Sequence, residues 1–216
     1  MATGNEWLTG SDWTGGTAPG ETGNAASTNS EIAVFNDYSS STIPASGLGI
    51  DMTAATGHLA LGAIELNSDS GTLRIGNSST TDNGLLRLNG ATTTAGAGTI
   101  IDVSGSSDLV LADAPDASNP SGTTLGVTLG SSGSQVSIAP GRTVTITSAI
   151  GEAAAGAELS LIGGGRLALG GTNTFSGGTT ISAGKLVATS AATFANSAAG
   201  MASVCHRALR GLAADR

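Results

Sequence analysis

The strongest candidates for chemistry in this chain are three aspartates in one short stretch, Asp108, Asp113 and Asp116. Clustered carboxylates can bind Ca²⁺, and a basic residue beside them can abstract a proton. With Asp102 and Arg142 nearby, such a cluster would suit Ca²⁺-dependent cleavage of an acidic polysaccharide. Against this interpretation, the chain has one lysine and few aromatic side chains to stack on sugars, and aspartates in turns usually bond their own backbone.

Three other arrangements of reactive residue types carry less weight. His58 opens an alternating apolar stretch, which is typical of an exposed strand residue. Ser182 and Lys185 have a spacing that acyl-serine hydrolases use on a helix, but the glycine between them indicates a turn. Cys205 and His206 are adjacent, and neighbouring side chains rarely face each other as a catalytic dyad. We therefore predict no catalytic, cofactor-binding or metal-binding residue, no cofactor, and a protein that is not an enzyme.

The elements that must position any such residue are short apolar alternations between residues 51 and 200. Apolar residues at i and i+2 are the pattern of a strand with one buried face. Each alternation is followed within a few residues by Gly, Asn or Asp, which suit turns, and helical periodicity is nearly absent. The alternations predict strands at 58–61, 72–75, 86–88, 101–103, 108–111, 135–138, 144–146, 159–161 and 166–169.

Composition favours a sheet protein and excludes several kinds of partner. Of the 216 residues 11% are charged, against roughly 25% in an average soluble protein. The net charge of −8 argues against nucleic acid, because phosphate binding needs a surplus of Lys and Arg. A single cysteine excludes an internal disulfide framework. No apolar run has the length of a membrane-spanning helix, and residues 1–20 lack the pattern of a secretory signal.

The alternations also resemble one another, since the stretch LALG at 59–62 recurs at 167–170. Self-similar short strands indicate a stacked repeat, and at roughly 20 residues per coil the region from 51 to 200 would form about seven coils. We predict an all-β fold, a right-handed parallel β-helix. A β-sandwich of antiparallel hairpins is the alternative, because its strands recur at similar spacing. The scarcity of large side chains argues against the sandwich.

One stretch has a pattern of its own: residues 163–190 are GGGRLALGGTNTFSGGTTISAGKLVATS. A Gly-rich start is followed by an L-x-L strand, by the signature at 173–180, and by a further strand that begins with Leu186. This pattern closely resembles the autotransporter-associated β-strand repeat of bacterial autotransporter passengers. Less closely, the order of Trp7, Trp13 and Phe35 is similar to the head of such passengers.

The chain divides into three regions by pattern. The first holds four of the six aromatic residues and is predicted to form a cap-like region, the second is the β-helical repeat region, and the third is an atypical basic tail. Their bounds are 1–50, 51–200 and 201–216.

The resemblance implies a non-enzymatic fragment of an exported autotransporter passenger, a stalk or adhesin-like module displayed at the cell surface or in the extracellular space. It also implies a C-terminal membrane barrel in full-length relatives. Partners would be host or environmental surface ligands or polysaccharide. The alternative is a carbohydrate-binding or polysaccharide-lyase-like β-helix protein.

Overall fold

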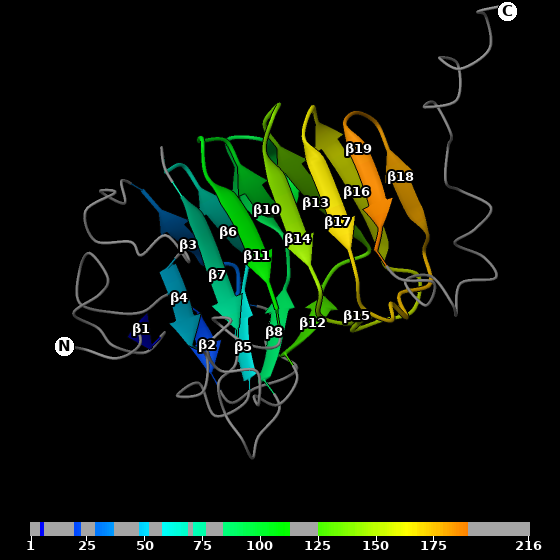
Figure 1. The fold of residues 1–216 in the computed structure, drawn as a ribbon. Coiled ribbons are helices and arrows are strands. Elements are labelled where there is room, and N and C mark those ends of the chain that lie inside the picture. The colour runs from blue at the N-terminus through cyan, green and yellow to red at the C-terminus, as the bar shows by residue number, and fades with distance from the viewer. Residues whose placement is uncertain are drawn as a thin grey trace, which may run out of the picture.

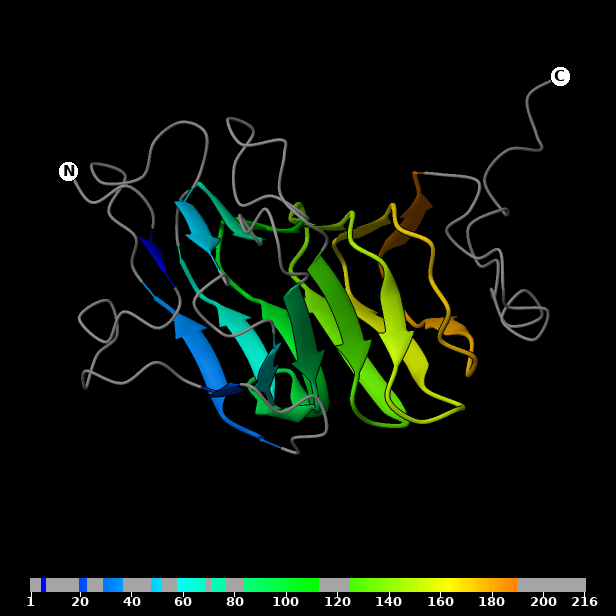
Figure 2. The same ribbon diagram turned by 90° about the horizontal axis from the view of Figure 1, so that it is seen from below.

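The computed structural model describes the chain in eight ranges, and every regular element in them is a strand. The strands form three sheets that enclose one hydrophobic core, and successive coils lie side by side in Figures 1 and 2. Within these ranges, no helix has the length and apolarity to cross a membrane. The ranges are 5–6, 20–22, 29–36, 48–51, 58–68, 71–76, 84–112 and 125–189.

Each sheet gathers strands from successive coils. The first sheet has the order β1 (Asn5–Glu6), β4 (Leu48–Asp51), β7 (Thr72–Gly76), β11 (Asp108–Leu111), β14 (Thr143–Ile146), β17 (Arg166–Leu169) and β19 (Lys185–Ala188). The second has the order β18 (Thr179–Ile181), β16 (Glu158–Gly163), β13 (Gly133–Ile138), β10 (Gly96–Val103), β6 (Ala63–Leu66) and β3 (Ile32–Phe35), with β9 (Ala91–Thr93) beside β10. The third has the order β15 (Ile150–Glu152), β12 (Leu125–Leu129), β8 (Gly84–Leu88), β5 (His58–Leu61) and β2 (Glu21–Thr22).

The ladders within these sheets are parallel except for two short pairs. The chain passes from the second sheet to the first and then to the third, as in β6, β7 and β8, before it begins the next coil. The exceptions are β9 against β10 and β2 against β5. This arrangement is a parallel β-helix, and the prediction of that fold is confirmed. A sandwich of hairpins is excluded, because hairpins require antiparallel neighbours.

The core follows directly from the period-two pattern. Leu73, Leu109, Val144 and Leu167 pair in register on four neighbouring strands of the first sheet, and each is buried. Since successive side chains of a strand point to opposite faces, alternate apolar residues stack in columns inside the coils. Burial of each such side chain contributes roughly 1.5–3 kcal/mol, so the columns supply the main cohesion of the fold.

The coils are longer than the sequence pattern predicts, except near the end of the described region. Leu73 pairs with Leu109 and Leu109 with Val144, so these coils take 36 and 35 residues. Leu167 pairs with Leu186 after only 19 residues. Within 58–189 the second sheet therefore contains five stacked strands, not the seven coils expected. Long connections between sheets take up the remaining residues.

Two strands of the predicted cap-like region continue the coils. β3 pairs with β6 and β4 pairs with β7, and Phe35 packs in the common core. Trp7, Trp13 and the basic tail at 201–216 lie outside the described residues, so the division into three regions stays a prediction.

Candidate functional site

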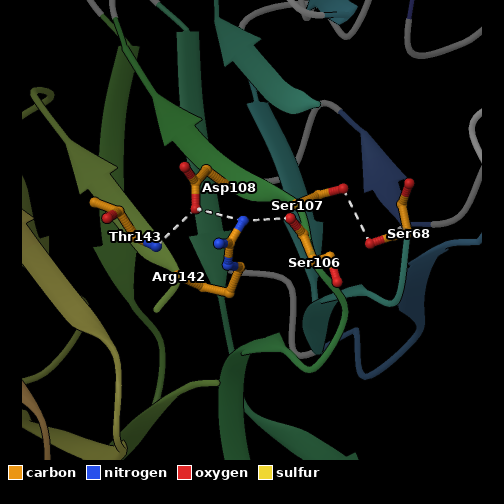
Figure 3. A network of polar contacts seen from close by, with 6 residues as sticks. All are labelled: Ser68, Ser106, Ser107, Asp108, Arg142 and Thr143. Atoms are coloured by element: carbon orange, nitrogen blue, oxygen red, sulfur yellow. Dashed lines mark hydrogen bonds and ion pairs between the residues drawn. The ribbon is translucent and has the colours of Figure 1, made fainter. Parts of the chain in front are cut away.

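Asp108 and Arg142, two of the residues considered for chemistry, meet at the corner where the chain enters the first sheet. Asp108 begins β11 and Thr143 begins β14, the next strand of the same sheet. The Thr143 amide donates to Asp108 Oδ1 at 2.8 Å, and Arg142 Nη1 lies 4.0 Å from the same oxygen. Arg142 Nη1 also donates to the carbonyl of Ser106, so its guanidinium lies between two acceptors (Figure 3).

The same network extends back to the preceding coil. The Ser107 hydroxyl is fully buried and donates to the carbonyl of Ser68 at 3.0 Å (Figure 3). These bonds tie three successive coils together at one corner. The carboxylate of Asp108 is engaged by a backbone amide and a neighbouring cation, which is the arrangement of a structural ion pair.

Asp102, which was expected near the aspartate cluster, lies in a different sheet. It belongs to β10, is 2% exposed, and accepts three hydrogen bonds at Oδ2. The donors are the hydroxyls of Thr93 and Thr94, at 2.9 and 2.8 Å, and the amide of Ala95, at 3.1 Å. Asp102 thus fastens the short β9 hairpin onto the outer face of the second sheet.

Of the three aspartates in the predicted cluster, the structure describes only Asp108. Asp108 and Arg142 meet, Asp102 does not join them, and Asp113 and Asp116 lie outside the described residues. In the described part of the chain there is no group of three or more His, Cys, Asp or Glu side chains able to hold a metal ion.

The other candidate arrangements are placed as follows. His58 begins β5 beside Leu85 of β8, and its Nδ1 has no hydrogen-bond partner among the described residues. Ser182 and Lys185 lie on either side of a turn at Gly184, whose φ is +81°, as the glycine between them indicated. Cys205 and its neighbour lie outside the described residues.

The start of the signature, residues 173–175, takes the place of a strand on the third side of its coil. Asn173 is 2% exposed, and its Oδ1 accepts the amide of Ile150 at 3.0 Å. The Thr174 amide donates to the carbonyl of the same Ile150 at 2.8 Å. A side-chain amide therefore replaces a backbone carbonyl in the ladder to β15. Phe175 follows, 3% exposed, with its ring in the core.

A sharp turn then returns the chain to the second sheet. Gly178 has a φ of +91°, a conformation that costs other residues energy. A Cβ on Gly177 would lie 2.4 Å from the carbonyl oxygen of Gly156 in the preceding coil, so only glycine fits there. Thr179 then resumes the parallel ladder against Leu159.

Comparison with known families assigns this segment. Residues 159–188 match the family model of the passenger-associated-transport-repeat. The segment is similar to this repeat, and we call residues 159–188 the transport repeat. The resemblance seen at 163–190 is thereby confirmed, with bounds that begin four residues earlier. No curated protein and no solved structure matches the chain.

The transport repeat is fastened to the coil before it through Glu152, a residue that the sequence pattern did not single out. Glu152 ends β15, and its Oε1 accepts a hydrogen bond from the Ser176 hydroxyl at 2.7 Å. Its Oε2 accepts hydrogen bonds from the backbone amides of Ser176 and Ala157, both at 3.0 Å. The Ser176 oxygen accepts the amide of Gly156 at 2.9 Å. A glutamate two dozen residues before a serine gives no local signal, so only the coil geometry reveals the pair.

Hydrogen bonding sets the charge of this contact. Burial raises the pKa of Glu152, but hydrogen bonds from Ser176, Ala157 and Gly156 outweigh it, so the pKa lies below its usual value of 4.5. A carboxylate with a depressed folded-state pKa stabilises the fold above its unfolded pKa, and that contribution is lost as the pH falls through the folded value.

We expect the link between the transport repeat and β15 to weaken in acid. Between pH 7 and about pH 3, the wild-type chain should lose more free energy of unfolding than Glu152→Gln, which has no proton to gain there. Urea unfolding at a series of pH values measures this. Ser176→Ala removes only the hydroxyl donor, so its loss of free energy of unfolding over this pH range should lie between those of wild type and Glu152→Gln. Parallel pH curves for wild type and Glu152→Gln would contradict the assignment.

Proposed function

We propose that the chain is part of an exported autotransporter passenger, displayed at the cell surface as a β-helical stalk or adhesin-like module without catalytic activity. The observation that carries the proposal is the transport repeat at 159–188, whose strands continue the coil stack in register. The repeat family supports a cell-surface or extracellular location.

The geometry suits a stalk. Each coil adds about 4.8 Å along the stacking direction, and one continuous core runs through all the described coils. Because each coil contacts only its neighbours, such a rod can lengthen by adding coils, and its turns can vary in length and carry recognition. Host or environmental surface ligands, or polysaccharide, are the partners that such turns would meet.

The bonding of the polar candidates supports a non-enzymatic role. The carboxylate of Asp102 is buried and occupied by three donors, and that of Asp108 is held by a backbone amide and Arg142. A general base needs a carboxylate free to reach a substrate proton. Asp102 lacks that freedom, and Asp108 is engaged at Oδ1 in a contact between neighbouring strands, which is the placement of a supporting residue.

Surface display tests the proposal. The full chain, carrying an epitope tag at its N-terminus, would be fused between a secretory signal and an autotransporter translocation unit in a Gram-negative host. We expect intact cells to bind the tag antibody and added trypsin to leave a resistant core fragment, since the parallel ladders protect the backbone. A fusion that lacks the translocation unit is the control and should leave cells unlabelled. Export that stalls in the periplasm would contradict the proposal.

A further inference from the structure

Three cations lie close together at the corner where the chain enters the first sheet, and two of them, Arg166 and Lys185, lie directly one above the other. Arg142, Arg166 and Lys185 stand at or beside the start of β14, β17 and β19, three consecutive strands. The Arg166 amide donates to the Arg142 carbonyl at 2.9 Å, and Arg166 pairs in register with Lys185. We name these three residues the basic column. They are three of the five Lys and Arg residues in the described part of a chain whose net charge is −8.

The turns before these residues hold the column at the spacing of single coils. Each cation follows a glycine-containing turn, with Gly141 at φ +78° and Gly184 at +81°. A Cβ on Gly165 would lie 2.2 Å from Ile138 Cγ2, and one on Gly184 would lie 2.5 Å from the carbonyl oxygen of Gly165. Successive turns are therefore in direct contact, and Arg166 and Lys185 project from paired strands about 4.8 Å apart.

Two of the three members of the basic column are not neutralised by the residues around them. Arg166 and Lys185 are exposed, and among the described residues neither side chain has a hydrogen bond or ion pair. Arg142 is the member with a carboxylate near it, Asp108 at 4.0 Å. Like charges directly opposite each other on paired strands are destabilising, so an anion that bridges Arg166 and Lys185 would relieve their repulsion.

We propose that the basic column binds a linear anionic polysaccharide, one that carries a carboxylate or sulfate group at short regular intervals. Arg166 and Lys185 follow the stacking direction with Arg142 beside them, and this arrangement suits a chain of regularly spaced anions that runs along the rod. Salt screens charges beyond about 10 Å, so the column acts locally although the whole chain is acidic. The inference deepens the proposed function, because a displayed stalk would meet such polymers, and it names the site and the ligand class.

Binding of defined oligogalacturonate and of dextran sulfate to the full chain tests the proposal, with calorimetry at low ionic strength as the measurement. We expect wild type to bind one or both polymers, with affinity that falls steeply as salt is added. Arg166→Gln/Lys185→Gln should lower the affinity at least fivefold. Both residues are exposed and repel each other, so the double variant should keep or slightly raise the urea midpoint of wild type.

A matched control separates the column from net charge. Thr92→Glu/Thr172→Glu changes two exposed residues elsewhere and brings the net charge to −10, the same as in the double glutamine variant. It should bind the polymers like wild type to within about twofold. Equal losses in the two variants would show that only net charge matters and would overturn the proposal.

Two further outcomes are decisive. If wild type binds neither polymer, the proposal fails. If light scattering shows instead that the column drives salt-sensitive association of the chain with itself, the occupant is a second copy and the polysaccharide is excluded. Successful surface display with no polymer binding would reject this inference while leaving the proposed function intact.

Discussion

Replacing Phe175 by alanine should lower the free energy of unfolding by about 3–5 kcal/mol. The ring is 3% exposed and lies in the core on the side of its coil where the transport repeat has no strand. Loss of the ring leaves a cavity that neighbouring coils cannot fill, because their own positions are fixed by the parallel ladders. Urea unfolding monitored by far-UV circular dichroism measures the change.

A variant that removes less volume controls for this result. Phe175→Leu keeps an apolar side chain in the same place, leaves a smaller cavity, and should cost clearly less than Phe175→Ala. If Phe175→Ala were within 1 kcal/mol of wild type, the ring would not be part of the core and the placement of the signature would be wrong.

The second large effect is expected at Gly163, which ends β16. Its φ is +81°, and a Cβ there would lie 2.4 Å from the carbonyl oxygen of Ile138. Gly163→Ala therefore combines a left-handed backbone penalty of about 1–2 kcal/mol with an overpacking cost of about 1–3 kcal/mol. Thermal and urea unfolding should both show the loss.

Gly141 provides the matched comparison one coil earlier. It has nearly the same φ, +78°, but a Cβ there would meet nothing within 4 Å. Gly141→Ala should therefore show only the backbone penalty. The difference between the two variants measures how tightly successive turns pack, and equal effects would mean that the turns are not in contact.

Much of the fold could be predicted from the sequence because one-sided burial in a sheet has a local signal. The alternations at 72–75 and 108–111 became β7 and β11, with Leu73, Ile75, Leu109 and Leu111 inside. The number of coils could not be predicted in the same way. It depends on the length of the connections between sheets, and a coil of 36 residues has the same strand pattern as one of 19.

The polar contacts were harder to predict, because their partners are far apart in the sequence. Glu152 and Ser176 are 24 residues apart, and Asp108 and Arg142 are 34 apart. In the sequence, Asp102 had no visible partner. In the structure, β9 lies beside β10, and Thr93 of β9 donates a hydrogen bond to the Asp102 carboxylate. A signal for the basic column was present: a glycine-containing turn followed by a cation recurs at Arg142, Arg166 and Lys185.

The parallel register that places the transport repeat on the preceding coil can be tested most directly by a disulfide. In a Cys205→Ser background, Thr145→Cys/Ala168→Cys joins two residues that pair in register across β14 and β17, about 4.8 Å apart between Cα atoms and within disulfide range. We predict efficient cross-linking on mild oxidation. Thr145→Cys/Val187→Cys spans two coils, about 10 Å, and should not cross-link. Cross-linking of the second pair, or failure of the first in the folded chain, would contradict the β-helix described above.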